Sequence, residues 1–377
     1  MSSQPAAILV LEDGRVFRGR SFGAAGETFG ELVFSTGMSG YQELLTDPSY
    51  HRQVVLTTAP HVGNTGWNDE DDESSRIWVA GFVVRDPAPR PSNWRSRGSL
   101  DAELARQGIV GIADVDTRAI TRHIREAGAM RVGISTQDLD EKSLLAKVLQ
   151  QPSMKGADLT GEVTISEPYV IPAKGEKVYT VAVLDLGIKS MSLERLSELG
   201  IEQHVLPATA TWDDVAAIGP DGVFFSNGPG DPAAATGPIS LLQEALANRV
   251  PYFGICLGNQ LFGHALGLRT YKLKFGHRGL NQPVKELATG KVEITAQNHG
   301  FAVDAPIGED VATPYGTARV SHICLNDDVV EGLELRRDGR LAAFSVQYHP
   351  EAAAGPHDST HLFDRFVEML ANAGKEA

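Results

Sequence analysis

The second half of the chain alternates short apolar runs with helical patterns, and no other feature constrains the fold as strongly. The runs YTVAVLDLG (179–187), IEQHVLPA (201–208) and DGVFFSNGPG (221–230) are typical of buried strands, and the third continues into a glycine-rich loop. Helical patterns follow the first and third runs, as KSMSLERLSELG and PISLLQEALANR (238–249), ahead of PYFGICLG. Such alternation predicts an α/β fold with a parallel sheet covered by helices. Ligands of such sheets bind beyond the carboxyl ends of the strands.

The first half of the chain is instead rich in strand patterns. The stretch 7–23 predicts two strands joined at the turn residues Asp13 and Gly14. Three more runs predict strands, namely GELVFSTG (30–37), QVVLTTAP (53–60) and RIWVAGFVV (76–84). Helical patterns follow at 99–108 and 116–128, the second with Asp116 as N-cap and Gly128 as its end. This half is therefore expected to form a mixed β/α domain.

The length of 377 residues also indicates two domains, because one hydrophobic core rarely extends past about 250–300 residues. Residues 151–177 lose clear periodicity and contain three prolines, which is typical of a linker. We therefore expect an N-terminal domain over 1–150, a linker over 151–177 and a C-terminal domain over 178–372. The acidic run DEDDE (69–73) is interpreted as a solvated loop.

Composition excludes several classes of function. The chain is 42% hydrophobic and 22% charged, as in ordinary soluble globular proteins. Its net charge of −14 argues against a nucleic-acid-binding surface and against anionic membrane as a partner. We find no signal-peptide pattern and no apolar run near the roughly 20 residues of a membrane span. The two cysteines, Cys256 and Cys324, are not expected to pair, and a reducing cytoplasm is the expected compartment.

The pattern Gly254-Ile-Cys256-Leu-Gly258 has the spacing of a nucleophile elbow, with sulfur in place of a serine oxygen. The glycines leave room for a strained turn between strand and helix, and the N-terminal N–H groups of that helix favour a reactive thiolate. The alternative is a buried structural cysteine, which is common in protein cores. The pattern alone leaves both interpretations open.

A nucleophilic cysteine needs a base and a group that orients the base. The strand-like AAFSVQYHPE (342–351) ends in His349, Pro350 and Glu351, where a histidine can transfer the proton and a carboxylate can hold its tautomer. The loop SNGPGDP (226–232) presents backbone N–H groups that suit an oxyanion hole, together with the N–H of Leu257. Taken singly, a half-exposed histidine in a turn and a plain Gly-Pro turn are the simpler interpretations.

Together these three elements, in this order, resemble the class I (triad) glutamine amidotransferases. Four other stretches resemble the small, glutamine-hydrolysing chain of carbamoyl-phosphate synthase: FSTGMSGYQELLTDPSYHRQ (34–53), GIADVDTRAITRHIRE (111–126), KFGHRGLNQPV (274–284) and QNHGFAV (297–303). The resemblance extends from about residue 7 to about residue 370. One departure is Asn259, where many members have His or Met, although the following Gln260 is retained.

This resemblance implies a role for each matching residue. The C-terminal domain would be a flavodoxin-like amidotransferase domain in which Cys256 is the nucleophile and His349 and Glu351 complete the triad. The residues expected to bind L-glutamine are Ser49, Gly228, Gly230, Leu257, Gln260, Asn298, Gly300 and Phe301. No metal site is expected, because His357 and His361 are only two ligands and are interpreted as part of a solvated helix start.

The resemblance also implies an enzyme that hydrolyses glutamine through a thioester and passes ammonia to a large synthetase chain. That partner would make carbamoyl phosphate from bicarbonate and ATP, for arginine and pyrimidine synthesis. No cofactor is expected in this chain, which lacks a P-loop pattern, so ATP and Mg²⁺ belong to the partner. Three alternatives remain open: a non-catalytic scaffold or regulatory subunit, an amidotransferase serving another synthetase, and a hydrolase without a partner.

Overall fold

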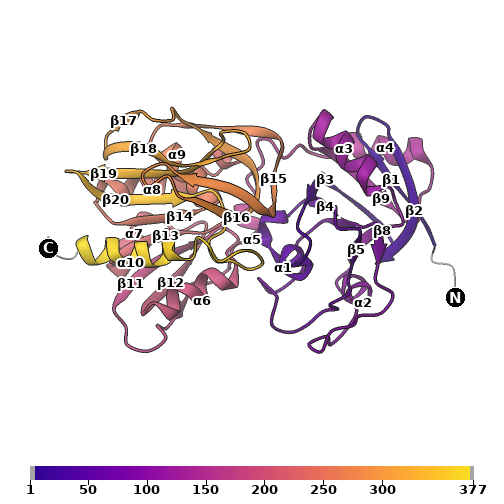
Figure 1. Ribbon diagram of the computed structural model, residues 1–377, viewed down its shortest axis with the longest axis horizontal. Coiled ribbons are helices and arrows are strands. Elements are labelled where there is room, and N and C mark those ends of the chain that lie inside the picture. The colour runs from indigo at the N-terminus through magenta and orange to yellow at the C-terminus, as the bar shows by residue number, and fades with distance from the viewer. Residues whose placement is uncertain (1–4, 374–377) are drawn as a thin grey trace. The chain divides into compact units, whose positions relative to one another are not determined.

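The computed structural model describes residues 5–373 and divides into two compact units. Unit 1 consists of residues 1–154 and 274–279, and unit 2 of residues 155–273 and 280–377, within the part of the chain that is described. Figure 1 shows the elements of each unit. Within residues 5–373, no helix is both long and apolar enough to cross a membrane.

Unit 1 is built on a closed barrel with the strand order β1-β2-β8-β6-β4-β3-β9. Its strands are β1 (Ala6–Leu11), β2 (Val16–Gly23), β3 (Glu27–Ser35), β4 (Gln53–Thr57), β6 (Gly81–Val83), β8 (Val110–Ala113) and β9 (Met130–Ser135). β1 and β2 pair antiparallel from Val10–Val16 outward, which confirms the hairpin predicted at Asp13-Gly14. The predicted strand over 76–84 is shorter than expected, because only 81–83 pair with β4 and β8. Two short strands, β5 (His61–Val62) and β7 (Asp86–Pro87), pair apart from the barrel.

The helices of unit 1 are α1 (Tyr41–Thr46), η1 (Pro48–Tyr50), α2 (Leu100–Arg106), α3 (Thr117–Ala127) and α4 (Glu141–Leu149). Those other than α1 begin where a short polar side chain caps them, whereas α1 follows Gly40 without a side-chain cap. The Asp116 carboxylate accepts a hydrogen bond from the Ala119 N–H, and Gly128 ends α3 with a φ of 106°, as the sequence predicts. Ile120 and Ile124 of α3 are fully buried against the barrel core.

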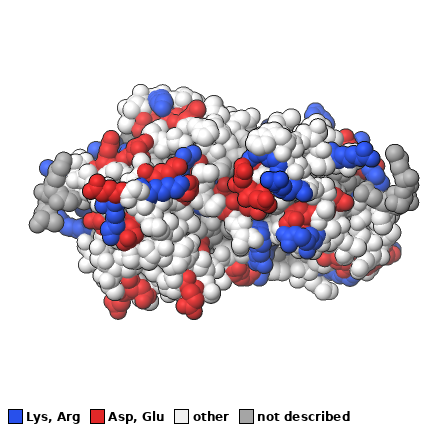
Figure 2. Space-filling view, turned by 90° about the horizontal axis from the view of Figure 1, so that it is seen from below, with Lys and Arg blue, Asp and Glu red and all other residues white. Residues whose placement is uncertain are grey.

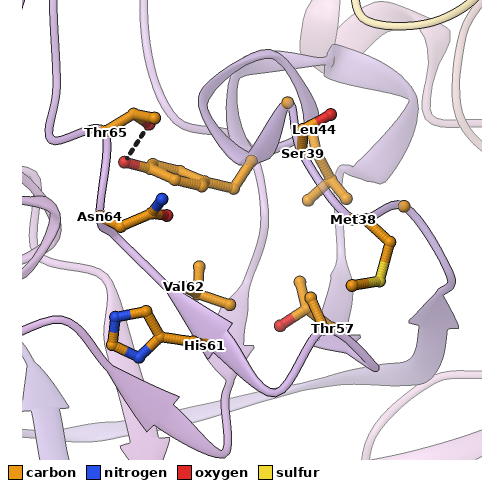
Figure 3. A pocket seen from close by; sticks show the side chains of 12 residues that line it. Met38, Ser39, Leu44, Thr57, His61, Val62, Asn64 and Thr65 are labelled. Carbon is orange, nitrogen blue, oxygen red and sulfur yellow. Dashed lines mark hydrogen bonds between the residues drawn. The ribbon is translucent and has the colours of Figure 1, made fainter. Parts of the chain in front are cut away.

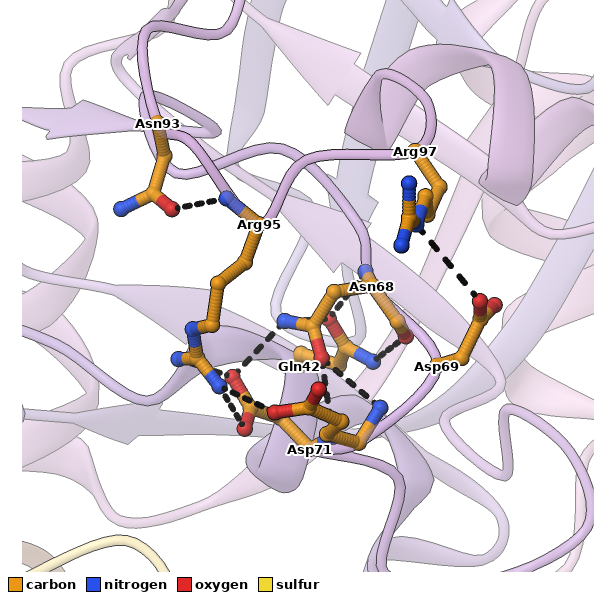
Figure 4. Close-up of polar contacts among 8 residues, drawn as sticks. Gln42, Asn68, Asp69, Asp71, Asn93, Arg95 and Arg97 are labelled. Atoms are coloured by element: carbon orange, nitrogen blue, oxygen red, sulfur yellow. Dashed lines mark hydrogen bonds and ion pairs between the residues drawn. The ribbon is translucent and has the colours of Figure 1, made fainter.

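The acidic run 69–73 lies in a loop, as expected, with Asp69, Glu70 and Asp72 exposed, but Asp71 is half-buried and Glu73 is buried. Asp71 accepts two hydrogen bonds of 2.8 Å from Arg95, as Figure 4 shows. Gln42 donates to Asp72 and to the Asn68 carbonyl, and the Glu73 N–H donates to Thr46. The acidic side chains therefore join two loops to α1. Their role could not be deduced from the charge run, because Gln42 and Arg95 lie more than 20 residues away on either side.

Unit 2 contains an 11-stranded sheet, whose central strands are parallel in the order β12-β11-β13-β14-β20. These are β11 (Tyr179–Asp185), β12 (Ile201–Pro207), β13 (Gly222–Phe225), β14 (Tyr252–Ile255) and β20 (Arg340–Val346). In chain order this arrangement is 2-1-3-4-5, the flavodoxin-like order. The expected α/β fold class is confirmed.

Helices cover both faces of these parallel strands (Figure 1). On one face, α7 (Trp212–Ile218), α8 (Thr236–Ala247) and α9 (Leu257–Ala265) contribute apolar side chains to a common core. On the other face, α6 (Ser190–Glu198) and α10 (His361–Ala373) do the same, with Leu196, Phe363 and Phe366 buried. The 3-10 turn η2 (Pro232–Ala234) lies in the loop before α8.

An antiparallel extension continues the sheet beyond β20. Its strands are β19 (Val330–Arg337), β16 (Val292–Asp304), β15 (Arg269–Glu286), β18 (Gly316–Cys324) and β17 (Asp310–Thr313). The stretch predicted as a linker holds α5 (Thr160–Val163) and β10 (Tyr169–Ile171), and β10 pairs with β12 at the other edge of the sheet.

Candidate active site

Cys256 lies on a sharp turn between β14 and α9. It has φ 54° and ψ −99°, a positive φ that side chains rarely adopt, and it is the N-cap residue of α9. Its N–H donates to the Val346 carbonyl of the neighbouring strand at 2.9 Å. Its Sγ lies 3.6 Å from the Asn298 carbonyl oxygen, and the residue is 1% exposed. Backbone strain of this kind is typical of functional sites, which favours the elbow over a structural cysteine.

The glycines around Cys256 are required by close packing. A Cβ at Gly258 would lie 2.5 Å from the Phe225 carbonyl oxygen, and one at Gly254 would lie 2.2 Å from the Tyr252 hydroxyl. The Gly258 N–H donates to the Ser226 carbonyl at 3.1 Å, which ties the start of α9 to the end of β13. These contacts bring the elbow next to the loop that follows β13.

His349 and Glu351 follow β20, the strand beside β14. The His349 Nδ1 lies 2.7 Å from the Glu351 Oε1, and its N–H donates to the Ala296 carbonyl at 2.9 Å. Both side chains are buried, and the His349 Nε2 has no hydrogen-bond partner within residues 5–373. The carboxylate therefore holds the ring through Nδ1 and leaves Nε2 available for proton transfer.

The charges of this pair are strongly coupled. Burial by itself would lower the pKa of His349, but Glu351 and Cys256 outweigh burial and raise the pKa of His349 to about 10. Burial would raise the pKa of Glu351, but Lys189 and His349 outweigh it and lower the pKa of Glu351 to about 2. At neutral pH the pair is therefore an imidazolium and a carboxylate.

Lys189 is a third member of this cluster that sequence reasoning missed. Its Nζ lies 3.0 Å from the Glu351 Oε1 and donates to the Ala353 carbonyl, and its side chain is 5% exposed. It follows β11, so it reaches the site from another strand end. The signal in the sequence was the lysine directly after the buried run VAVLDLGI, where a solvated charge is not expected.

The glycine-rich loop also lies at a strand end, after β13. A Cβ at Gly228 would lie 2.1 Å from the Leu186 carbonyl oxygen, so the loop packs directly on the end of β11. Gly230 has φ 99° and pairs with Asp158 in an isolated bridge. Leu257 is the first residue of α9, and its N–H has no acceptor inside the helix. Backbone N–H groups are thus the donors that this part of the site offers.

Four residues predicted to bind glutamine lie on α9 and β16, the two elements that contact each other at Cys256. Gln260 Nε2 on α9 donates to the Phe301 carbonyl at 2.8 Å, and Asn298, Gly300 and Phe301 follow one another on β16. Asn298 contributes the carbonyl that contacts the thiol. The structure therefore brings these residues together with the elbow.

Gln347, on the stretch between β20 and His349, was not predicted. Its Oε1 accepts from Gln260 Nε2 at 3.1 Å and from Asn259 Nδ2 at 3.2 Å, while its own Nε2 is buried without a partner within residues 5–373. Asn259 also accepts from the Ser345 hydroxyl at 2.8 Å. The unusual Asn259 is thus accommodated by a buried hydrogen-bond network rather than facing an empty space.

Ser49 belongs to unit 1, in the turn η1. The Asp47 carboxylate accepts from the Ser49 N–H at 2.9 Å, and the serine is 4% exposed. This geometry is that of an ordinary capped turn, as the residues alone indicate. The role of Ser49 in glutamine binding stays a prediction.

Unit 1 also contains a small hollow of about 90 Å³, whose lining residues come from the same part of the sequence as Ser49. Met38, Tyr41 and Val62 line it, together with the Thr57 hydroxyl, which is buried without a hydrogen bond within residues 5–373 (Figure 3). Such a volume holds a few water molecules rather than an organic ligand.

The remaining candidates keep structural roles. Cys324 is fully buried, and both cysteines are free thiols. α10 begins at His361, so His357 lies before the helix and the two histidines are not a helical pair. His361 instead lies 2.8 Å from a Glu293 oxygen.

The sequence matches two family models. Residues 9–134 match the carbamoyl-phosphate synthase small chain, CPSase domain, and residues 182–369 match glutamine amidotransferase class-I. The chain is 67% identical over 366 residues to the carbamoyl phosphate synthase small chain of Streptomyces avermitilis, covering 97% of this chain and 96% of the relative. It is 59% identical over 376 residues to that of Mycobacterium tuberculosis (98% and 99%) and 57% identical over 396 residues to that of Bifidobacterium longum (100% and 97%).

The buried Cys256, His349 and Glu351 at adjoining strand ends, the barrel of unit 1 and these near full-length matches lead to one conclusion. The chain belongs to the family of carbamoyl-phosphate synthase small chains, with a class I glutamine amidotransferase domain.

Proposed function

We propose that this chain is the glutamine-hydrolysing subunit of a carbamoyl-phosphate synthase. The observation that carries the proposal is the buried His349–Glu351 pair, joined at 2.7 Å, beside a cysteine on a strained elbow. A nucleophile, a base and a group that orients the base are the minimum set for covalent hydrolysis of an amide. Family membership favours L-glutamine as the substrate.

In the first half of the reaction, the Cys256 thiolate attacks the side-chain amide carbon of glutamine. The negative charge that develops on the amide oxygen is stabilised by N–H groups of Leu257 and of the loop from Gly228 to Gly230. The imidazolium of His349 then donates its Nε2 proton to the departing nitrogen. The C–N bond breaks, ammonia leaves and a γ-glutamyl thioester remains on the sulfur. A raised pKa of His349 suits this step, because the proton is present at neutral pH.

In the second half, the neutral His349 takes a proton from water, and the resulting hydroxide attacks the thioester carbonyl. The tetrahedral intermediate is held by the same N–H groups, and its collapse breaks the C–S bond. Glutamate is released, and the thiolate and imidazolium are restored. Gln260, Asn298, Gly300 and Phe301 are proposed to line the glutamine pocket, and Ser49 to contribute from unit 1.

The released ammonia is proposed to serve a large synthetase chain that makes carbamoyl phosphate from bicarbonate and ATP. This chain has no Gly-x-x-x-x-Gly-Lys-[Ser/Thr] pattern, which supports assigning ATP and Mg²⁺ to the partner. We propose that the small chain itself uses no metal or cofactor. A cytoplasmic location is also proposed, and the two buried free thiols support it.

The test is glutamate release from L-glutamine by the purified chain, alone and with a large chain, ATP and bicarbonate. The wild type is expected to react slowly alone and faster with the partner. Cys256→Ala is expected to lose essentially all activity, because removing the nucleophile of such a triad costs about 10⁶-fold in kcat. A matched Cys324→Ala variant should keep it. If the wild type released no glutamate even with the partner, the scaffold alternative would replace this proposal.

A further inference from the structure

Three arginines on α3, in unit 1, lie on one face of the helix. Arg118, Arg122 and Arg125 are spaced by four and three residues, so they span an arc of roughly 60° at 3.6 residues per turn. They line a hollow of about 350 Å³ together with three threonines, Thr58, Thr117 and Thr121. Every residue that lines this hollow is a hydrogen-bond donor.

Among the described residues, these arginines have no anionic partner. Within residues 5–373, none of the three takes part in an ion pair or a side-chain hydrogen bond, although the chain carries a net charge of −14. Other arginines of the same unit are paired, such as Arg95 with Asp71 and Arg131 with Glu12. On the face that Figure 2 draws, acidic and basic side chains are interspersed.

Three like charges on one helix face destabilise the helix, since residues three and four apart are neighbours. Glu126 lies four residues after Arg122 and is the acidic residue of α3 closest to this face. Among the described residues, Glu126 and Arg122 form no ion pair. The repulsion between these arginines raises the free energy of the folded chain when nothing is bound. Such an arrangement is expected where a bound anion offsets the repulsion.

A second observation also indicates a ligand. The Thr121 hydroxyl oxygen is buried and has no hydrogen-bond partner within residues 5–373, and Thr121 is one of the residues that line the hollow. Buried polar groups are nearly always paired in native structures, so an unpaired one needs an explanation. A bound acceptor would give this hydroxyl its missing partner.

The donors favour phosphate over carboxylate. Three guanidinium groups carry five N–H donors each, and the threonine hydroxyls add more, whereas a carboxylate offers only two oxygens. A phosphate group offers three terminal oxygens and is bound bidentately by arginine. The volume also falls in the range of pockets for small organic ligands. We propose that this hollow binds the phosphate group of a small phosphorylated ligand, at a site separate from the glutamine chemistry.

The test measures binding of inorganic phosphate, and of AMP against adenosine, to the full chain by calorimetry at constant ionic strength. Phosphate and AMP are expected to bind saturably, and adenosine is not. The double variant Arg118→Gln/Arg122→Gln is expected to bind them at least about tenfold more weakly, because each charged hydrogen bond contributes about 1.5–3 kcal/mol. Arg18→Gln, an exposed arginine of unit 1 that pairs with Glu141, is the control and should bind as the wild type does.

A second variant separates a binding role from a structural one. Thr121→Val keeps the shape but removes the unpaired hydroxyl, so it should weaken phosphate binding several-fold without lowering the melting temperature. Glutamate release should be unchanged in all three variants. The proposal is overturned if the arginine variants bind phosphate as the wild type does. It is equally overturned if acetate competes as well as phosphate, which would indicate a carboxylate-bearing protein segment as the occupant.

Discussion

At the scale of single residues, the site depends on a row of buried charges rather than on the triad alone. Lys189 contacts the same Glu351 oxygen that holds the His349 ring. The carboxylate is fully buried, and without the lysine it would face only one positive partner. An uncompensated buried charge is costly, so the lysine is expected to stabilise both the fold and the ionised state of the triad.

We therefore expect Lys189→Met to lower the free energy of unfolding by about 3–5 kcal/mol, the usual effect of removing one partner of a buried pair. It should also lower kcat for glutamate release while leaving KM for glutamine nearly unchanged, since the lysine acts through Glu351. Urea denaturation and steady-state kinetics measure the two effects. Lys174→Met removes an exposed lysine that pairs with Glu194 and serves as the control. Equal behaviour of the two variants would contradict the assigned role.

The His349–Glu351 pair also predicts how stability depends on pH. The raised pKa of His349 stabilises the fold fully below its unfolded value of 6.5, and this contribution is lost as the pH rises through about 10. The lowered pKa of Glu351 stabilises the fold above its unfolded value of 4.5, and this contribution is lost as the pH falls through about 2. The destabilisation caused by Glu351→Gln should therefore be largest between pH 4.5 and 6.5.

Denaturation of the wild type and of Glu351→Gln at pH 3, 5.5 and 9 measures the difference between their free energies of unfolding. It should be greatest at pH 5.5 and smaller at the two extremes. A difference that stays constant over this range would show that the pair does not titrate as the coupled charges require.

At the scale of elements, the site is formed where four strands end. β11, β13, β14 and β20 are parallel neighbours, so Lys189, the loop at Gly228, Cys256 and His349 all follow strands that end at one edge. Each strand was predictable because it is a short apolar run bounded by turn residues. The strand predicted over 76–84 shows the limit of prediction from sequence. It is shorter than expected because pairing partners, and not propensity, decide where a strand begins.

The close approach of α9 to β13 can be tested at Gly258. Gly258→Ala should destabilise the chain by about 1–3 kcal/mol and strongly reduce glutaminase activity, since the new methyl group collides with the Phe225 carbonyl and displaces Cys256. Gly237→Ala is the matched control in α8, where nothing lies within 4 Å of the new atom. It should stabilise by about 0.4–1 kcal/mol. Thermal unfolding and glutamate release distinguish the two, and an active, stable Gly258→Ala enzyme would contradict this packing argument.

At the scale of the whole molecule, each unit has its own hydrophobic core. The barrel core of unit 1 includes Leu9 and Val132, and the cores on the two faces of the unit 2 sheet include Phe253 of β14 and Leu261 of α9. Tryptophans are unevenly distributed, with Trp67, Trp78 and Trp94 in unit 1 and Trp212 in unit 2. The unfolding of each unit can therefore be followed separately.

Leu9→Ala is expected to cost about 2–5 kcal/mol, because Leu9 is fully buried in the barrel. The transition seen by tryptophan fluorescence should move to a lower temperature, while the temperature at which Cys256 becomes reactive toward a bulky thiol reagent should move less. Phe253→Ala, in the sheet of unit 2, should show the reverse. If both probes shifted together in both variants, the two units would unfold as one.

The sequence by itself determined the alternation of strands and helices over 179–258, the α/β class and the candidate residues Cys256, His349 and Glu351. It could do so because apolar periodicity, glycine at strained turns and a histidine at a strand end are local properties of the chain. Only the tertiary structure decided that Lys189 contacts Glu351, that Gln347 accepts from Gln260 and Asn259, and that the acidic run 69–73 pairs with Arg95. These contacts join residues far apart in the sequence, and their partners are set by the packing of strands and loops, which no local pattern records.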